Sequence, residues 1–276
     1  MKTKLLKIGA FALAVLLIVG VVVFANALIG NPISNALATN TAKKYIEKTY
    51  AGTDYELTGV NYSFKDGYYH AGVKSKSSID THFSLMIDSF GNLKEDYFDE
   101  YVSSGWNTAH RIDLDYRNNT KTLFESASFP FNAYITFGEI ILVSEEYEGL
   151  PDTPDYAIPI SSLTMDAFYN ANELGKSHGK LTVYIYDDSV TVERLSEVLL
   201  EIRRCFDDAG IGFYAINCVI EYTRDENGAY DVGRVEVMDF RYSDIYEEGL
   251  VERVDKANKE AEEYYRLADL EKDIVE

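Results

Sequence analysis

The chain is poor in the residues that cross-link small extracellular domains or build common catalytic sites. Its 276 residues include only 2 cysteines, 1 tryptophan and 4 histidines. Two cysteines exclude a disulfide-dense scaffold. They also exclude a cysteine-based zinc site, because no histidine lies within 25 residues of either. With 5 prolines and 46% hydrophobic residues, the chain does not have the composition of a disordered segment.

Basic residues are scarce too, 26 against 46 acidic ones. Lys2, Lys4 and Lys7 precede the first acidic residue, so the chain beyond them has 23 basic residues and a net charge of −23. Such a surface repels phosphate backbones, and we expect no nucleic-acid partner. Acidic surfaces also keep many proteins soluble, so the charge by itself indicates no particular ligand.

Residues 8–29 form an uncharged, apolar segment. As a helix it would be roughly 30 Å long, the thickness of the bilayer hydrocarbon. The three lysines before it predict a cytoplasmic N-terminus by the positive-inside rule. We therefore interpret residues 1–30 as the transmembrane anchor of a single-pass cell-membrane protein. Residues 8–29 contact the membrane, and the acidic body is extracellular.

A cleaved signal peptide is the alternative interpretation of this segment. Ala25-Asn26-Ala27 fits the small-x-small cleavage pattern. The apolar run is longer than the usual signal core of about 7–15 residues, which favours an uncleaved anchor. Because the uncharged stretch continues to Ala42, we expect the anchor to lead into the first helix of the body, with a break at Asn31-Pro32.

Residues 31–149 are predicted to form a first α+β domain. Apolar and polar residues alternate on both sides of Asp66-Gly67, which is typical of a β-hairpin. The expected elements are a helix at 33–50, strands near 60–64, 69–73, 83–87 and 93–97, a helix at 107–125 and a buried strand at 132–143.

Residues 150–276 are predicted to form a second α+β domain. Three of the five prolines fall within 149–159, which favours a domain boundary there. The order β-α-β-β-α that follows is typical of a two-layer sandwich. The expected elements are a short helix at 163–174, a strand at 181–186, a helix at 191–208 capped by Thr191, strands at 213–223 and 230–240 around a turn at 225–228, and a closing helix with an apolar stripe of Leu250, Val254, Ala257, Ala261, Tyr264 and Ala268. The predicted fold class is thus α+β, a transmembrane helix followed by two small domains of helices on antiparallel sheets.

Several segments of the first region carry a family resemblance. GNPIS (30–34), VNYSFKDGYYHAGVKSKSSIDTHFS (60–84) and YVSSGWNTAHR (101–111) resemble the YfjL-like proteins of Gram-positive bacteria, and 180–216 is similar to the C-terminal part of the longer members. The resemblance implies an anchored, surface-facing bacterial protein, and it carries over no catalytic residue. The helix followed by antiparallel strands also resembles PepSY-like and cystatin-like modules at the level of the fold alone.

Four residues are candidates for ligand binding. His82 and Ser84 alternate with Phe83 and Leu85, so they lie on the opposite face of a strand, which is either solvated or covered by another element. Trp106 opens the second predicted helix, where it serves either as an interaction anchor or as a plug at a sheet edge. The fourth candidate, His110, follows on that helix.

No catalytic residue, metal ligand or cofactor site is predicted. Ser177-His178-Gly179-Lys180 matches Ser-x-x-Lys without its partner motifs. Neither of two partial acidic patterns has the spacing of a complete calcium loop. These patterns are Asp113, Asp115 and Asn118, and Asp225, Asn227 and Asp231. Cys205 and Cys218 either pair across a helix–strand contact or are two buried apolar side chains.

Two hypotheses about function follow. The first is a non-enzymatic, membrane-anchored binding module for a protein, peptide or cell-wall ligand, which would use an exposed sheet face or edge. The 22 tyrosines suit such a surface, although they are also ordinary strand residues. The alternative is an extracytoplasmic hydrolase with an unfamiliar site of carboxylates and His82 or His110.

We expect the mature protein to keep its N-terminal segment. An uncleaved span is held by lipid hydrocarbon, so the intact chain should remain in the membrane after alkaline carbonate extraction. Protease added outside cells should digest the body. Mass spectrometry of the membrane fraction reports the N-terminus, and a mature chain that begins near Leu28 would replace the anchor with a secretion signal.

Overall fold

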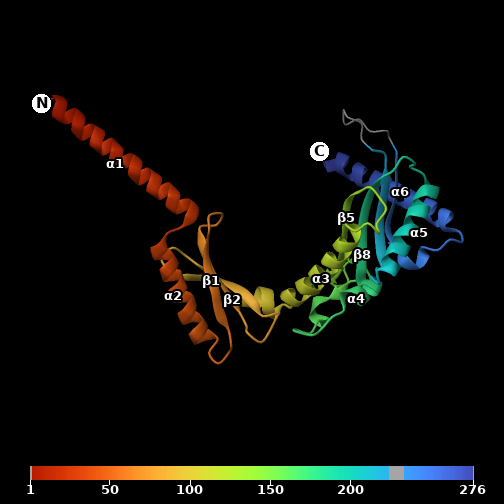
Figure 1. Cartoon of the computed structure of the whole chain (residues 1–276), viewed down its shortest axis with the longest axis horizontal. Helices are drawn as coiled ribbons and strands as arrows, with labels where there is room; N and C mark the ends of the chain where they lie inside the picture. Colours follow the sequence, from red (N-terminus) through yellow and green to blue (C-terminus); the bar gives the residue numbers. More distant parts are fainter. Residues whose placement is uncertain (1, 224–232, 276) are drawn as a thin grey trace. The chain divides into compact units, whose positions relative to one another are not determined.

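An apolar helix opens the chain and leads into two folded units. The computed structural model describes residues 2–223 and 233–275, and residue contacts divide the chain into Met1–Thr108 and Ala109–Glu276. Helix α1, Lys2–Ile29, contains Gly9–Asn26, the one stretch within the described ranges that is long and apolar enough to cross a membrane, with a mean hydropathy of 2.5. The side chains of this stretch are not buried against the protein, and α1 projects from the first unit (Figure 1).

The junction between α1 and α2, Pro32–Thr49, falls at the expected break. Gly30 has a φ of +70°, and a Cβ there would lie within 3 Å of the Tyr62 and Tyr69 side chains. Asn31 then caps α2 by accepting a hydrogen bond from the Ser34 N–H, at 2.8 Å. The Tyr69 hydroxyl accepts from the Asn31 N–H at 2.9 Å and donates to the Asn31 carbonyl at 3.3 Å. The polypeptide is therefore fixed to the sheet where α1 ends.

The first unit is a four-stranded antiparallel meander with one helix on it. Its strands are β1 (Glu56–Ser63), β2 (Tyr68–Lys74), β3 (His82–Ile87) and β4 (Leu93–Asp96), in the order β1-β2-β3-β4. Helix α2 covers one face of this sheet (Figure 1).

Alternation along β2 and β3 builds the core of the first unit. Every second side chain of these strands is buried against the small residues of α2, as the sequence predicts. The rings of Tyr50, Phe83 and Phe98 cluster at one end of this core, with centroids 5.2–5.3 Å apart. Beside them, the hydroxyls of Tyr45 and Tyr50 both donate to Oδ2 of Asp96, at 2.9 and 2.7 Å. Packing and charge-assisted hydrogen bonds thus fix α2 to the β4 edge.

The second unit is a mixed four-stranded sheet packed against helices. Its strands are β5 (Ala133–Ile140), β8 (Gly179–Tyr186), β9 (Ala215–Glu221) and β10 (Arg234–Arg241), in the order β10-β9-β8-β5. Strands β8 and β9 run parallel, and α5, Val192–Asp208, is the crossover between them. The other two pairings are antiparallel. The predicted α+β class is confirmed, with one parallel pair among the antiparallel ones.

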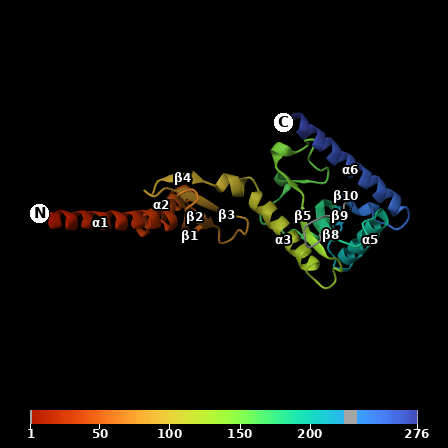
Figure 2. The same cartoon turned by 90° about the horizontal axis from the view of Figure 1, so that it is seen from above.

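Three long helices pack against this sheet. Buried residues of α5 pack with Leu181, Val183 and Ile185 of β8 in one core, which also takes Ile112 and Tyr116 from α3. Helix α3 spans Trp106–Phe124, and α6 spans Leu250–Val275. α6 runs beside β10 and α5 (Figure 2), and Oδ1 of its buried Asn258 accepts the β10 Glu236 N–H at 2.8 Å. This hydrogen bond satisfies a backbone donor on the edge strand.

Short elements connect these helices and strands. A helix labelled η1, Asp99–Ser103, precedes α3. A parallel pair of short strands and several brief helices lie between β5 and β8. They are β6 (Leu142–Val143), η2 (Glu145–Tyr147), β7 (Ile158–Pro159), η3 (Ile160–Ser162) and α4 (Ala171–His178). The helix η4, Tyr242–Asp244, follows β10.

The structure departs from the sequence analysis at three places in the second half of the chain. The strand expected at 132–143 is β5 of the second sheet, so contacts divide the chain near residue 108 and not at the proline-rich 149–159. The helix expected at 163–174 begins only at Ala171, because Asn170 accepts hydrogen bonds from the N–H groups of the first helical turn. Tyr264 does not continue the buried stripe of α6, since 59% of it is exposed. The turn expected at 225–228 lies outside the described residues.

The two cysteines are free and buried. Cys205 on α5 donates from Sγ to the Ser128 carbonyl at 3.2 Å, and Cys218 lies in the core of β9. Burial raises the pKa of both thiols, as expected of unreactive core cysteines.

We expect Thr191→Ala to destabilise the second unit by about 1 kcal/mol. The Thr191 hydroxyl accepts the Arg194 N–H at 3.1 Å, and its loss leaves a donor of the first α5 turn unpaired. Chemical denaturation followed by circular dichroism measures the change. Ser189→Ala, at an exposed position before the cap, is the control, and equal midpoints for the two variants would contradict the capping role.

Candidate binding surfaces

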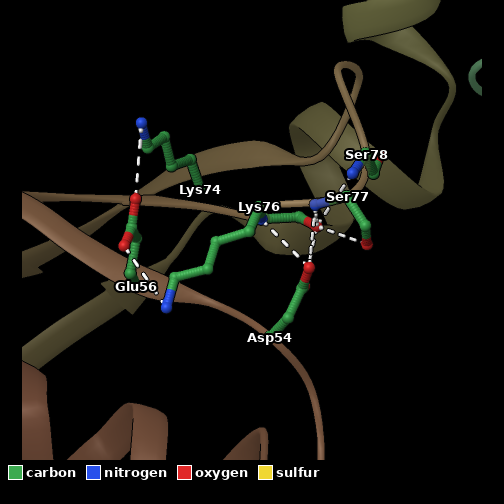
Figure 3. A network of polar contacts seen from close by, with 7 residues as sticks. Asp54, Glu56, Lys74, Lys76, Ser77 and Ser78 are labelled. Atoms are coloured by element: carbon green, nitrogen blue, oxygen red, sulfur yellow. Dashed lines mark hydrogen bonds and ion pairs between the residues drawn. The ribbon is translucent and has the colours of Figure 1, made fainter.

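The loop between β2 and β3 is a rigid polar structure built around Asp54. Oδ1 of Asp54 accepts the Ser75 hydroxyl at 2.7 Å, and Oδ2 accepts the Lys76 and Ser77 N–H groups at 3.1 and 2.8 Å (Figure 3). The hydrogen bond from the Ser75 hydroxyl is the largest of the effects that hold the pKa of Asp54 below its ordinary value. Ser75 Oγ in turn accepts the Ser77 and Ser78 N–H groups. The loop backbone is thus held by one carboxylate and one hydroxyl.

This loop is joined to the start of α3. Asn107 donates from Nδ2 to the carbonyls of Asp80 and His82, at 2.9 and 2.6 Å. The Thr108 hydroxyl donates to Oδ2 of Asp80 at 2.9 Å, and both residues are buried. Segments 60–84 and 101–111, which carry the family resemblance, therefore meet in one buried polar cluster. Burying these polar groups without hydrogen bonds would cost free energy of folding, so the hydrogen-bonded cluster has a structural role.

The four predicted binding residues are exposed or half-buried. His82 is exposed on β3 opposite Lys74, and Ser84 is half-buried on the same face opposite Gly72. Trp106 is 50% exposed at the first position of α3, so it is not a fully buried plug. His110 is exposed on α3 and belongs to the second unit. The Asn107 bonds bring the start of α3 next to β3, and with it Trp106.

The second sheet has an aromatic patch that the sequence analysis missed. We call the tyrosine face the set Tyr134, Ile135 and Phe137 of β5 with Tyr184 and Tyr186 of β8. The strand register places Ile135 opposite Tyr184 and Phe137 opposite Thr182, on the side away from the buried Leu181, Val183 and Ile185. Tyr134, Ile135 and Phe137 are 39%, 38% and 37% exposed.

A register shift in β5 shapes this face. The pairing slips between Ala133 and Ile135, as in a β-bulge. It lets Tyr134 stack on Tyr186, with ring centroids 4.3 Å apart and planes 19° apart. Burial and then a hydrogen bond with Glu221 raise the pKa of Tyr134, so its hydroxyl stays protonated. Contacts within the protein therefore fix the positions of these rings.

Paired charged side chains lie at the other end of the same sheet. Lys180 of β8 lies 2.7 Å from Oδ1 of Asp239, which also accepts the Tyr156 hydroxyl at 2.8 Å. Arg241 stacks over the rings of Tyr156 and Tyr214, 5.1 and 4.5 Å from their centroids. These charges already have protein partners. The tyrosine face, in contrast, presents apolar side chains to solvent.

The alternation in LTVYIY (181–186) could have revealed this face. Its apolar residues alternate with Thr182, Tyr184 and Tyr186, which predicts two different strand faces. The sequence predicts a buried strand at 132–143. Exposure of Ile135 and Phe137 corrects that expectation, since a strand at a sheet edge is covered less completely than a central one.

Two surface hollows in the described part of the second unit are lined mainly by α5 residues. One, of ≈ 640 Å³, lies over α5 and is lined by five carboxylates that include Asp207 and Glu247, together with Arg203 and Arg204. The other, of ≈ 360 Å³, adjoins Cys205. Neither is lined by His82 or His110. Among the residues that the structure describes, no group of three histidine, cysteine or acidic side chains is arranged to hold a metal ion.

The chain thus belongs to the class of proteins in which an apolar N-terminal helix precedes two α+β units. Comparison with known families identifies it more closely. Residues 4–97 match the YfjL-like N-terminal domain and residues 115–255 match the YfjL-like C-terminal domain. The chain therefore belongs to the YfjL-like family. No curated protein and no solved structure matches it.

We expect Asp54→Asn to weaken the acid dependence of the first unit's stability. The pKa of Asp54 is lowered in the folded state, so its contribution is complete above the unfolded value of about 3.9 and is lost as pH falls through the lower folded value. An amide in its place cannot accept all three hydrogen bonds, so the variant is less stable at pH 7 and loses less stability between pH 5 and pH 2.

Denaturant midpoints across that pH range test this expectation. Glu95→Gln, at an exposed position of β4, removes a carboxylate from the same unit and is the matched control. An Asp54→Asn profile parallel to that of the unmodified protein would show that another carboxylate governs the acid dependence.

Proposed function

We propose that this YfjL-like protein is a single-pass membrane protein whose two units lie outside the cytoplasm and bind a protein or peptide partner. In this proposal α1 is the anchor, with Lys2, Lys4 and Lys7 on the cytoplasmic side. In a Gram-positive bacterium the units would face the cell wall. The apolar composition and length of Gly9–Asn26 support the span.

The tyrosine face is the observation that carries the binding proposal. Its partly exposed aromatic and aliphatic side chains, Tyr134, Ile135 and Phe137, are joined by the half-buried rings of Tyr184 and Tyr186, and tyrosine is enriched at the energetically important positions of protein interfaces. The stacked pair of Tyr134 and Tyr186 is held in place by its own packing, so a partner orders few side chains on binding. A rigid aromatic surface next to satisfied charges favours recognition over catalysis.

We expect the partner to have apolar or cationic groups where it contacts this surface. The second unit, Ala109–Glu276, contains 16 basic and 36 acidic residues, a net charge of −20. This charge favours the approach of a cationic protein or peptide. A cell-wall glycan, which could also stack on tyrosine rings, is the competing ligand that the experiment must distinguish.

The hydrolase alternative has no specific observation in its favour. His82 and His110 are exposed and belong to different units of the chain. A general base needs a reacting group held within hydrogen-bond reach, and neither histidine lines a described hollow.

Photo-crosslinking in the native membrane tests the proposal. A benzophenone amino acid replaces Phe137 in the full chain, and we expect an adduct with a distinct protein band after irradiation. The same group at Phe168, 90% exposed between η3 and α4, is the control. Adding Tyr134→Ser and Tyr186→Ser should reduce the adduct roughly tenfold or more, the effect of losing aromatic hot spots.

Three results would argue against this function. Equal adducts from positions 137 and 168 would mean unspecific contact, and no adduct at position 137 would mean that the face is unoccupied. An adduct removed by muramidase but not by protease would assign the face to wall glycan.

A further inference from the structure

Four exposed apolar side chains lie at the end of the first unit where α1 joins it. Ile33 and Leu37 are 75% and 43% exposed on α2, and Phe64 and Phe90 are 63% and 83% exposed in the β1–β2 and β3–β4 turns. We call these four residues the junction patch. Exposed single apolar residues are common, and Ile79 and Trp106 are exposed at the opposite end of the unit. The four residues of the junction patch differ in that they adjoin the apolar helix α1, which makes them a candidate contact surface.

The topology of the meander places both turns at this end. The β1–β2 and β3–β4 turns lie at one end of the sheet, and the β2–β3 loop lies at the other. The two turns are two strand spacings apart, roughly 10 Å. Contacts of Gly30 with Tyr62 and Tyr69, which flank the first turn, tie that turn to the end of α1. The hairpin in Figure 1 lies beside the point where α1 meets the first unit.

The second turn is tied to α2 just as directly. Thr41 donates from its hydroxyl to the Gly91 carbonyl at 2.7 Å, and a Cβ on Gly91 would lie 3.1 Å from Cβ of Leu37. Phe90 is therefore next to the exposed stripe of α2, on which Ile33 and Leu37 are one turn apart. Both turns and the first two turns of α2 share one side of the unit.

Carboxylates hold the two phenylalanine-bearing turns in shape. Asp88 accepts the Phe90 N–H and the Asn92 N–H, each at 2.9 Å, and Asp66 accepts the Tyr68 N–H at 3.0 Å. The Asp88 bonds fix the backbone on both sides of Phe90, and a hydrogen bond from the Gly67 N–H to the Ser63 carbonyl, at 2.8 Å, closes the turn that contains Phe64. Phe64 and Phe90 are thus displayed by ordered turns, and displaying them costs little further ordering on contact.

We propose that the junction patch rests in the surface of the lipid bilayer that α1 crosses. This inference depends on the anchor in the proposed function. Ile33 follows Ile29, the last residue of α1, by four residues, so it lies within roughly 14 Å of the helix end even for extended chain. Phenylalanine, leucine and isoleucine at that depth reach the boundary between headgroups and acyl chains.

The charge distribution is compatible with such contact. Residues 31–108 contain 7 lysines and 10 acidic residues, a net charge of −3, whereas residues 109–276 carry −20. The unit next to the anchor is therefore nearly neutral, and the repulsion from anionic lipid arises mainly in the second unit. Lipid contact would hold the first unit upright at the membrane.

Tryptophan fluorescence in lipid nanodiscs tests the patch in the full chain. Trp106, the single tryptophan, is first replaced by Phe. Phe90→Trp and Phe64→Trp are then made separately, and quenching by brominated acyl chains is measured. The control is Phe168→Trp, at a position that is 90% exposed in the second unit. We expect the quenching at positions 64 and 90 to be at least about twice that of the control.

A fourth variant separates this inference from the anchor. Val21→Trp places the probe within the apolar stretch of α1 and should be quenched strongly if α1 is inserted. If Val21→Trp is quenched but the tryptophans at positions 64 and 90 are quenched no more than the one at position 168, the proposed lipid contact of the junction patch is wrong. The anchor would still be supported. An unquenched Val21→Trp would overturn the anchor and this inference together. Circular dichroism of each variant confirms that the fold is retained.

Discussion

The structure of the first unit depends on how an apolar helix is ended and joined to a folded sheet. A helix that suits hydrocarbon must stop where water begins, and its last carbonyls then need partners. Gly30 turns the chain with a left-handed residue, and Asn31 begins α2 by capping it. Tyr69, buried in the sheet, bonds both backbone groups of Asn31. Because of these bonds, the direction of the chain after α1 is set by the sheet.

The two sheets use their open faces differently. On the first, the residues opposite the core include Gly72, Ser84 and His82, and exposed apolar side chains lie in the turns near α1 and, at the other end of the sheet, at Ile79 and Trp106. On the second, the open face at β5 and β8 is aromatic. In our proposal these two surfaces have different binding roles. The first unit contacts lipid, and the second unit, which carries most of the negative charge, recognises a partner.

Much of the fold could be predicted from local pattern. Alternation located the strands of the first sheet, and the 3.6-residue period with Thr191 as cap placed α5 to within a residue. The domain division was harder, because three prolines in 149–159 look like a linker, whereas that segment is packed beside the second sheet through β7 and Tyr156. The predicted binding residues His82 and Ser84 were placed on the correct strand face, but the tyrosine face was not foreseen. Whether a tyrosine is exposed depends on which strands are neighbours.

The sequence by itself determined the apolar helix, its lysine flank, the acidic body and most element boundaries. Each of these follows from composition or from the geometry of a few neighbouring residues. Only the tertiary structure decided that β5 joins β8, that β8 and β9 run parallel, and that Asp80 meets Thr108. It also decided that Phe64, Phe90 and Leu37 share one end of a unit. Those placements join residues far apart in the chain, and they result from the packing of a whole core, which no local pattern records.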